Sequence, residues 1–302
     1  MSERWDLPTG EVYVRHVPGH SASGGFAVFV HGLGGSSLNW VDLMPLLASD
    51  VECLALDLPG FGASPPPHDG DYSPAGHARA VARTVRHWQS VSGDDRPVHV
   101  FGNSMGGAVA LQLAVREPGL VASLTLISPA LPTRRTRRGN AHLPVVAVPG
   151  LGESLLRRYR QVSAEARVAA TLDACFVDVS SVSPALREAL TAEVIARDAY
   201  PYVGDAFLSS LRGLLRGFAD PTTQRPWALA RRITRPVLAL YGEDDVLVHP
   251  SGARRAAREF PDAQVVLLSR TGHAAQMEHP ELVADLWRRA ILDRAPRPVT
   301  SP

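Results

Sequence analysis

The amino-acid sequence predicts an α/β fold, a mostly parallel sheet flanked by helices and interrupted by a helical insertion. Short apolar runs alternate along the chain with segments of helical periodicity, which is the pattern of a sheet sandwiched between helices. Most of these runs are apolar throughout, as is typical of strands covered on both faces. The strand rhythm stops between about residues 130 and 235. The 302 residues, 45% of them hydrophobic, suit one large domain or a core with an insertion.

The first 130 residues contain five expected strands, the first of which alternates apolar and polar side chains. This strand, 11–17, runs into Pro18-Gly19 and is expected to be a half-exposed edge strand. Ser73 and Pro74 form an N-cap and first helical position, so a helix begins there. The other strands are expected at 26–30, 51–57, 98–101 and 124–127, and the helices at about 37–48, 73–88 and 108–114.

The region after residue 129 reads as helices broken by Pro and Gly, with no strand. The helical pieces are 151–161, 164–174, 184–199 and 202–217. Because this stretch is too long for a loop in a compact domain, we expect an inserted helical cap at 130–234. The core would then comprise 1–129 and 235–302, with strands at 236–241 and 263–268, helices at 249–260 and 275–292, and a frayed tail at 294–298.

Composition excludes several function classes. The formal net charge of +1 gives no indication of nucleic-acid binding. The dense basic cluster at 134–138 is read first as a solvated loop, with a site for an anionic substrate tail or a membrane surface as the alternative. Cys53 and Cys175 are too few and too far apart for a disulfide framework. With no apolar leader and no run long enough to span a bilayer, the chain is expected to be cytoplasmic, without stable membrane insertion.

A Gly-x-Ser-x-Gly turn lies between the strand at 98–101 and the helix that follows. Ser104 is at its apex, and Gly102 and Gly106 leave room for a tight turn because they have no Cβ. This geometry raises the Ser104 hydroxyl above the sheet edge and aims a helix N-terminus at it. Ser104 is therefore the candidate nucleophile, although a glycine-rich turn with an idle serine is the simpler alternative.

A serine nucleophile needs a base, and the chain has 11 histidines. His273 is favoured because it follows Thr271-Gly272 on a loop after the last strand. His31 also follows a strand, but we expect its ring to hold the glycine-rich loop beside it in shape. His279 falls in or near a helix, and His99 lies within a strand.

The base in turn needs a carboxylate that selects its tautomer and stabilises the imidazolium. Asp245 and Asp244 both follow the strand at 236–241. Asp245 is favoured because the third position after Gly242 lets the loop turn back over the sheet end. Asp244 stays as the second candidate, and capping of the helix near residue 249 is the structural alternative for both. Asp57 is expected to brace the Pro59-Gly60 turn.

An acyl-transfer site also needs donors for the developing oxyanion. The N–H of Met105, first in the helix after Ser104, is one expected donor. The N–H of Leu33, in the Gly32-Leu33-Gly34-Gly35 loop, is the other. The alternative for this loop, a phosphate cradle, would need a Gly-Lys-Ser/Thr ending that is absent. No metal-ligand spacing or nucleotide fingerprint occurs, so no cofactor and no metal are expected.

Taken together, these motifs resemble the α/β-hydrolase superfamily, in the family's own order of Ser, Asp and His. The resemblance covers about 10–129 and 235–292 and includes His31-Gly32, the 57–62 Asp-Leu-Pro-Gly-Phe-Gly run and Gly272-His273. It implies an eight-stranded sheet and a cap that lines the substrate pocket. The segments at 102–107 and 272–279 are similar to the meta-cleavage-product hydrolases, which split C–C bonds, and to cofactor-free haloperoxidase-like esterases.

We therefore expect a serine hydrolase that cleaves carboxylic esters of small to medium hydrophobic substrates through an acyl-enzyme on Ser104. C–C bond hydrolysis is the first alternative, weakened by Ala274, where those hydrolases often carry an aromatic residue. A ligand-binding relative with vestigial catalysis is the second. The expected partners are a hydrophobic acyl substrate and water, and the sequence leaves a monomer or a homodimer open.

Overall fold

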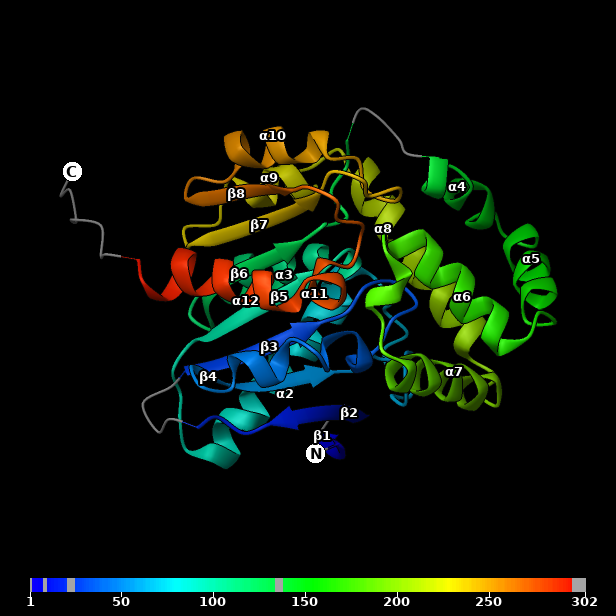
Figure 1. Ribbon diagram of the computed structural model, residues 1–302, viewed down its shortest axis with the longest axis horizontal. Helices are drawn as coiled ribbons and strands as arrows, with labels where there is room; N and C mark the ends of the chain where they lie inside the picture. Colours follow the sequence, from blue (N-terminus) through cyan, green and yellow to red (C-terminus); the bar gives the residue numbers. More distant parts are fainter. Residues whose placement is uncertain (1, 8–9, 21–24, 134–137, 295–302) are drawn as a thin grey trace.

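The described residues form an eight-stranded sheet in which the second strand runs opposite to the other seven (Figure 1). The computed structural model describes residues 2–7, 10–20, 25–133 and 138–294. The strand order is β1-β2-β4-β3-β5-β6-β7-β8, and β2 is antiparallel to both β1 and β4. The expected mostly parallel sheet is confirmed. The strands are β1 (Ser2–Leu7), β2 (Gly10–Val17), β3 (Gly25–Val30), β4 (Val51–Leu56), β5 (Val98–Asn103), β6 (Val121–Ile127), β7 (Val237–Gly242) and β8 (Ala263–Leu268).

Helices cover both faces of the sheet and bury its apolar side chains in two clusters. One cluster joins the sheet to α2 (Pro74–Ser92), α3 (Met105–Arg116) and α10 (Ser251–Glu259). The other joins it to α1 (Met44–Leu47) and α12 (Pro280–Trp287). Because both faces are covered, the central strands read as continuous apolar runs.

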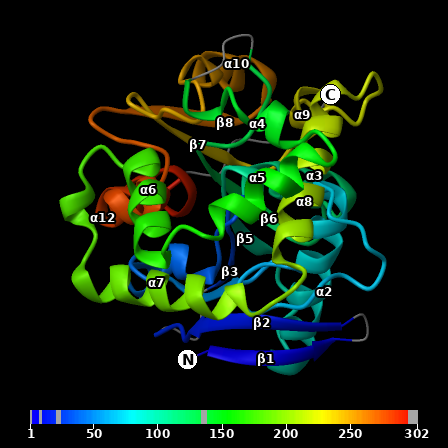
Figure 2. The same cartoon turned by 90° about the vertical axis from the view of Figure 1, so that its right-hand side faces the viewer.

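Between β6 and β7, the described residues form helices and no strand. Five of these helices lie beyond the carboxyl ends of the parallel strands (Figures 1 and 2), whereas α9 packs against α3 and α10 of the core. The helices are α4 (Leu143–Val146), α5 (Leu151–Tyr159), α6 (Ala164–Cys175), α7 (Pro184–Asp198), α8 (Val203–Ala219) and α9 (Pro226–Ala230). We refer to α4–α8 as the cap helices. The division into core and cap at residues 130 and 234 stays a prediction.

The expectation that 11–17 forms an edge strand is wrong. β1 pairs with β2 from Ser2 opposite Arg15 to Leu7 opposite Gly10, so β1 is the outer strand. The alternating burial of β2 is real, but it reflects one solvated face and not an unpaired edge. The β1 segment, Ser-Glu-Arg-Trp-Asp-Leu, has too few apolar residues to reveal a strand.

Two helices expected as continuous are broken at prolines. The stretch 37–48 forms a 3-10 turn at Ser37–Trp40 and then α1, with Pro45 in the first turn of α1. The stretch 275–292 forms α11 (Ala275–Glu278), α12 and a π-helical turn at Arg288–Leu292. Pro45 and Pro280 each lack the N–H that a helix interior needs, so each lies in the first turn of a new helix.

Within the described residues, no helix is long and apolar enough to cross a membrane. The arginines at 134, 135 and 137 lie outside the described residues, as does the tail from residue 295. The expectations for the basic cluster and the frayed tail therefore stay predictions.

Candidate active site

Ser104 occupies a strained turn between β5 and α3. Its backbone has φ 53° and ψ −117°, and α3 begins at the next residue, Met105. A Cβ on Gly102 would lie 2.5 Å from the carbonyl oxygen of Gly106, and one on Gly106 would lie 2.1 Å from that of Val30. These approaches explain why glycines flank the serine two residues away on each side. The positive φ of a non-glycine residue costs about 1–3 kcal/mol, which the surrounding packing must supply.

His273 and Asp245 form a buried pair at the same end of the sheet. His273 Nδ1 lies 2.9 Å from Asp245 Oδ2, and the side chains are 7% and 1% exposed. The N–H groups of Leu247 and Val248 each donate to Asp245 Oδ1 at 2.8 Å. The carboxylate therefore has acceptor positions filled on both oxygens, and the imidazole is oriented with Nδ1 toward it.

The pKa of Asp245 lies below its usual value. Burial by itself raises this pKa. The positive charge and hydrogen bond of His273, with the hydrogen bonds from the Val248 N–H and the Ser128 hydroxyl, lower the pKa by more than burial raises it. Asp245 is thus held as a carboxylate that can stabilise an imidazolium. Asp244, the second candidate, is exposed to solvent, and its N–H donates to the Thr271 carbonyl.

The other histidines considered as a base lie in different environments. His99 Nδ1 is 2.8 Å from the Ser123 hydroxyl, and His279 Nε2 is 3.2 Å from the Arg270 carbonyl oxygen. None of the hydrogen bonds of the described residues joins either ring to a carboxylate or to Ser104.

His31 holds the loop that carries the Leu33 N–H. The Leu58 N–H donates to His31 Nε2 at 2.9 Å, so Nδ1 carries the proton and donates to the Gly32 carbonyl oxygen at 2.7 Å. Burial lowers the pKa of His31 to about 4, which keeps the ring neutral. Because the oxygen and hydrogen of a trans peptide point in opposite directions, this bond orients the N–H of Leu33. The Gly35 N–H closes the turn onto the same Gly32 oxygen, and Gly34 permits it with φ 80°.

The second expected oxyanion donor, the N–H of Met105, lies at the first residue of α3. The first N–H groups of a helix have no intrahelical partner and lie at the positive end of its dipole. The arrangement could therefore accept negative charge next to Ser104 from two sides.

Asn103 links the Ser104 turn to the His273 loop. Its side-chain amide donates to the carbonyl oxygens of His273 at 3.0 Å and Ile127 at 3.1 Å. Among the described residues, no hydrogen bond joins the Ser104 and His273 side chains themselves. Catalytic hydrogen bonds in unliganded enzymes are often longer than in the reacting complex.

The cap helices contact both loops of the site. Cys175, at the end of α6, accepts hydrogen bonds through its carbonyl oxygen from the N–H groups of His273 at 2.6 Å and Ala274 at 3.3 Å. On α7, Glu193 accepts a 2.6 Å hydrogen bond from the Ser36 hydroxyl, and Arg197 donates to the Gly34 carbonyl oxygen at 2.9 Å. The glycine-rich loop and the histidine loop are thus both tied to the insertion.

Several of these contacting residues were not anticipated from the sequence. Ser128 carried a partial signal, since Ser128-Pro129 directly follows a strand, and its backbone has φ 42°. Asn103 lies within the Gly-x-Ser-x-Gly motif and could have been singled out there. Glu278, whose carboxylate accepts a hydrogen bond from the Gly272 N–H, lies in the 272–279 segment but was not singled out there. Glu193 gave no signal, because a carboxylate on a helix is normally solvated.

A second histidine–serine pair lies away from this site. His77 Nε2 is 3.0 Å from the Ser210 hydroxyl, between α2 and α8, and both side chains are fully buried. Burial lowers the pKa of His77 to about 3. Because no substrate carbonyl can reach a fully buried hydroxyl, this pair is a packing contact between the two helices.

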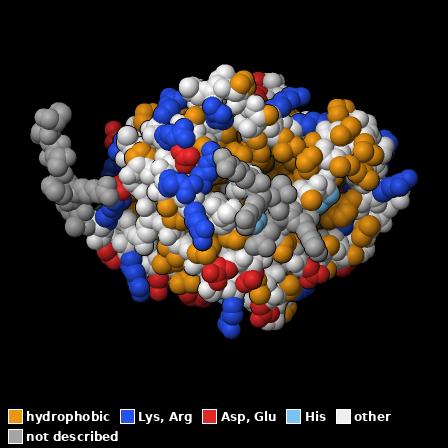
Figure 3. Space-filling view, turned by 90° about the horizontal axis from the view of Figure 1, so that it is seen from above, with side chains coloured by type: hydrophobic (Ala, Val, Ile, Leu, Met, Phe, Trp, Pro, Cys, Tyr) orange, Lys and Arg blue, Asp and Glu red, His pale blue; other side chains and the backbone are white. Residues whose placement is uncertain are grey.

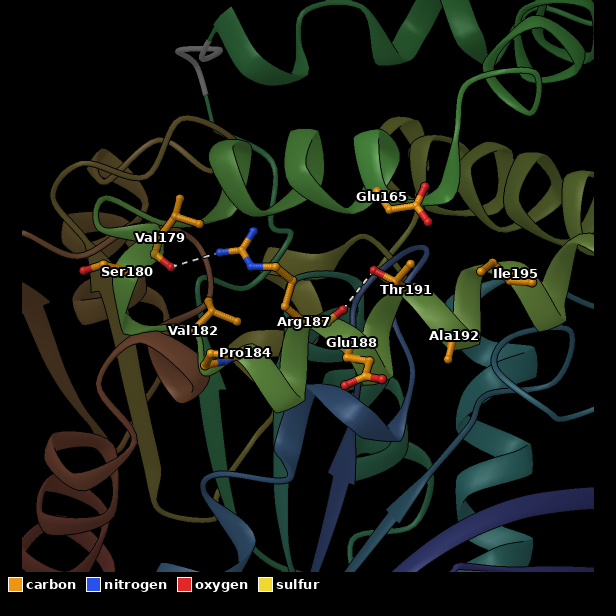
Figure 4. Close-up of a pocket in the computed structure, with 10 residues that line it drawn as sticks. All are labelled: Glu165, Val179, Ser180, Val182, Pro184, Arg187, Glu188, Thr191, Ala192 and Ile195. Carbon is orange, nitrogen blue, oxygen red and sulfur yellow. Dashed lines mark hydrogen bonds between the residues drawn. The ribbon is translucent and has the colours of Figure 1, made fainter.

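An open groove of about 690 Å³ lies on the outer part of the cap, between α6 and α7 (Figure 4). Glu165 lies on one side and Glu188 on the other, with Arg187 directed at the Val179 carbonyl oxygen. None of its lining residues belongs to the His273–Asp245 pair or the Ser104 turn.

The chain belongs to the alpha/beta hydrolase fold family, whose model matches residues 28–280. It is 30% identical over 257 residues to the dihydrolipoyllysine-residue acetyltransferase component of the acetoin cleaving system of Pseudomonas putida. That match covers 85% of the chain and 60% of the relative, so the chain spans less than two thirds of its length.

A second relative is the 2-hydroxy-6-oxononadienedioate/2-hydroxy-6-oxononatrienedioate hydrolase of Cupriavidus pinatubonensis, 28% identical, with 88% of the chain and 85% of the relative covered. This match confirms the similarity to the meta-cleavage-product hydrolases. The crystal structure of a lipase described as putative from Acinetobacter baumannii superposes with a TM-score of 0.77 at 22% identity, covering 97% of the chain and 91% of that structure. At that identity, the likeness concerns the fold. The protein is an α/β-hydrolase.

Proposed function

We propose that the protein is a serine hydrolase that cleaves carboxylic esters through an acyl-enzyme on Ser104. Ser104 Oγ attacks the ester carbonyl carbon while its proton passes to His273 Nε2. The N–H groups of Leu33 and Met105 receive the developing oxyanion. Collapse of the intermediate breaks the bond to the leaving alcohol, which takes the proton from His273. A water molecule, activated by His273 in the same way, then releases the acid.

The observation that carries this proposal is the buried 2.9 Å contact between His273 Nδ1 and Asp245 Oδ2 at the sheet end that bears Ser104. A histidine with Nδ1 engaged by a carboxylate presents Nε2 as a base. The strained backbone of Ser104 supports the same reading, because strain of this kind collects at functional sites.

Apolar surface on the cap supports hydrophobic substrates of small to medium size. Apolar side chains gather on the cap half of the face seen in Figure 3, at the right of the view. Six large hydrophobic residues of α4, α5 and their flanks are more than a third exposed, namely Val145, Val148, Leu151, Leu155, Tyr159 and Val162. A contiguous exposed apolar area commonly marks a binding region.

The test is a series of p-nitrophenyl esters of increasing acyl length, run beside labelling with a fluorophosphonate. We expect turnover that depends on acyl length and a single adduct on Ser104, both lost in Ser104→Ala. An intact wild-type protein with neither turnover nor an adduct would contradict the proposal.

C–C bond hydrolysis is the second candidate, and the relative from Cupriavidus pinatubonensis favours it. The same three residues would act on a ketone flanked by the bond to be cleaved. Ala274 argues against it, because the meta-cleavage-product hydrolases often carry an aromatic residue at this position. Turnover of a vinylogous diketone much faster than that of any p-nitrophenyl ester would establish this candidate in place of the first.

A further inference from the structure

We propose that Glu278 is a positioning residue that ties the end of cap helix α6 to the backbone of the His273 loop, so that the cap holds the base in its reactive orientation. The inference rests on the proposed function, because it assigns His273 as the base. Glu278 lies at the end of α11, five residues after His273 along the chain.

The Glu278 carboxylate connects two segments that are about a hundred residues apart in the sequence. Oε1 accepts hydrogen bonds from the N–H groups of Val177 at 2.7 Å and Asp178 at 3.1 Å, just beyond α6. Oε2 accepts from the Gly272 N–H at 2.7 Å. Each oxygen thus serves a different segment, one in the cap and one immediately before the base.

The Glu278 carboxylate is buried, and its hydrogen-bond partners are these backbone N–H groups. Glu278 is 5% exposed, and among the described residues it takes part in no ion pair with an arginine, lysine or histidine. An ionised buried carboxylate needs donors in place of water, and three N–H groups provide them. The hydrogen bond from the Gly272 N–H is buried, whereas those from Val177 and Asp178 are partly buried at the edge of the cap. Removing the carboxylate would therefore leave a buried donor unpaired on the His273 loop and would release the α6 end from that loop.

The cap backbone also contacts the base directly, which makes the junction sensitive to the distance between the two segments. The Cys175 carbonyl oxygen accepts from the N–H groups of His273 and Ala274. A Cβ on Gly272 would lie only 2.3 Å from that same oxygen, so the segments approach to a distance that only glycine permits. The Glu278 carboxylate forms a second link between the same two segments, through the Val177 and Gly272 N–H groups.

These contacts indicate that the ring and the backbone of the His273 loop are held by different residues. Asp245 binds the imidazole ring and Cys175 binds the N–H groups of His273 and Ala274, whereas Glu278 binds the N–H of the preceding residue, Gly272. Loss of the Glu278 carboxylate should therefore displace the His273 imidazole relative to Ser104 and leave substrate binding unchanged. Displacements of about 1 Å at a catalytic group can lower the rate about 100-fold.

The test compares Glu278→Gln with a matched control, Glu153→Gln, in the full-length protein. Glu153 also bridges a backbone N–H, that of Gly150, and a second segment, through Arg212, but it does so within the cap. Competent sites are counted by burst titration, so that kcat is expressed per reactive serine and a smaller folded fraction has no influence. The rate constant of fluorophosphonate labelling is measured in parallel, because labelling also requires the base.

We expect Glu278→Gln to lower kcat per titrated site and the labelling rate constant together, by about 10- to 100-fold. KM should change by less than about threefold. Amide hydrogen exchange should accelerate at Gly272 and Val177. Glu278→Asp, which retains the charge but is one methylene too short to reach both segments, should show a smaller loss of the same kind. Glu153→Gln should keep the wild-type values.

Three results would overturn the inference. The first is a Glu278→Gln variant with lower thermal stability but an unchanged kcat per site, which would make Glu278 a purely structural brace. The second is a rise in KM alone, which would place its effect on substrate binding. The third is full activity in Glu278→Asp. A wild-type protein without turnover or adduct is a separate result, since it removes the proposed function itself and this inference with it.

Discussion

The side-chain amide of Asn103 donates a 3.0 Å hydrogen bond to the main-chain carbonyl of His273, across 170 residues of sequence. Its second contact, at 3.1 Å, is to the Ile127 carbonyl at the end of β6. The residue before the candidate nucleophile therefore holds the residue proposed as the base. Substitution of Asn103 therefore tests whether its amide positions His273.

Asn103→Asp should reduce kcat by about 10- to 100-fold, because the variant replaces an amide donor by a carboxylate that faces two carbonyl oxygens. The measurement is ester turnover per titrated site. Gln89→Glu is the control, since the Gln89 amide also donates to a carbonyl, that of Arg96, but on the exposed surface. Equal kcat in both variants would contradict a role for Asn103 in placing His273.

Asp245→Asn should lower kcat by roughly 1,000-fold or more, because an amide at this position can present an N–H to Nδ1 and select the wrong tautomer of His273. Asp244→Asn, the neighbouring exposed change, should leave kcat within about twofold of wild type. Steady-state ester kinetics distinguish the two. A larger loss of kcat in Asp244→Asn than in Asp245→Asn would identify Asp244 as the carboxylate that orients His273.

Ser104→Gly should eliminate turnover and raise the free energy of unfolding. Glycine accepts the backbone angles of φ 53° and ψ −117° at little cost, whereas serine is strained there by about 1–3 kcal/mol. Denaturant unfolding of wild type, Ser104→Ala and Ser104→Gly measures this difference. Ser104→Ala keeps the Cβ and should show less stabilisation than Ser104→Gly, and an unstrained turn would make all three alike.

Gly106→Ala should destabilise the fold by several kcal/mol, about 3 or more, since the new Cβ would lie 2.1 Å from the Val30 carbonyl oxygen. Gly119→Ala is the matched change, because no atom lies within 4 Å of a Cβ there. Thermal unfolding of the two variants gives the comparison. A Gly106→Ala protein as stable as Gly119→Ala would mean that the close approach of α3 to β3 can relax.

The free energy of unfolding should fall as the pH is lowered from about 6.5 to 4. Burial lowers the pKa of His31 to about 4 and that of His77 to about 3, from 6.5 in an unfolded chain. In this window the unfolded chain binds protons that the folded chain does not, so acid favours unfolding by up to about 1.4 kcal/mol per pH unit for each histidine. The full contribution is present above pH 6.5.

Denaturant unfolding at pH 7, 6 and 5 tests this dependence. His77→Gln should flatten the pH dependence by removing one buried histidine, whereas the exposed His68→Gln should leave the slope unchanged. Parallel slopes in all three proteins would show that other groups cause the acid sensitivity.

Local sequence was sufficient for most of the sheet and for the turn at Ser104. The central strands are covered on both faces, so continuous apolar runs such as 26–30 identified them, and the flanking glycines identified the turn. It was insufficient for β1, whose polar residues pair at an edge, and for the helices divided at Pro45 and Pro280. A polar edge strand and a proline within an amphipathic pattern are decided by pairing and backbone geometry, to which periodicity is insensitive.

The sequence by itself determined which chemical groups this protein can use, because a strand, a glycine-flanked turn and a helix place Ser104 through local steric rules. Only the tertiary structure decided how those groups are supported. Two of the supporting contacts, Glu278 with Val177 and Asn103 with His273, join segments a hundred or more residues apart. A third, between Glu278 and the Gly272 N–H, is local but satisfies a backbone donor whose partner no sequence pattern specifies. Buried polar groups must find partners wherever the packed chain brings them, and that location is a property of the fold as a whole.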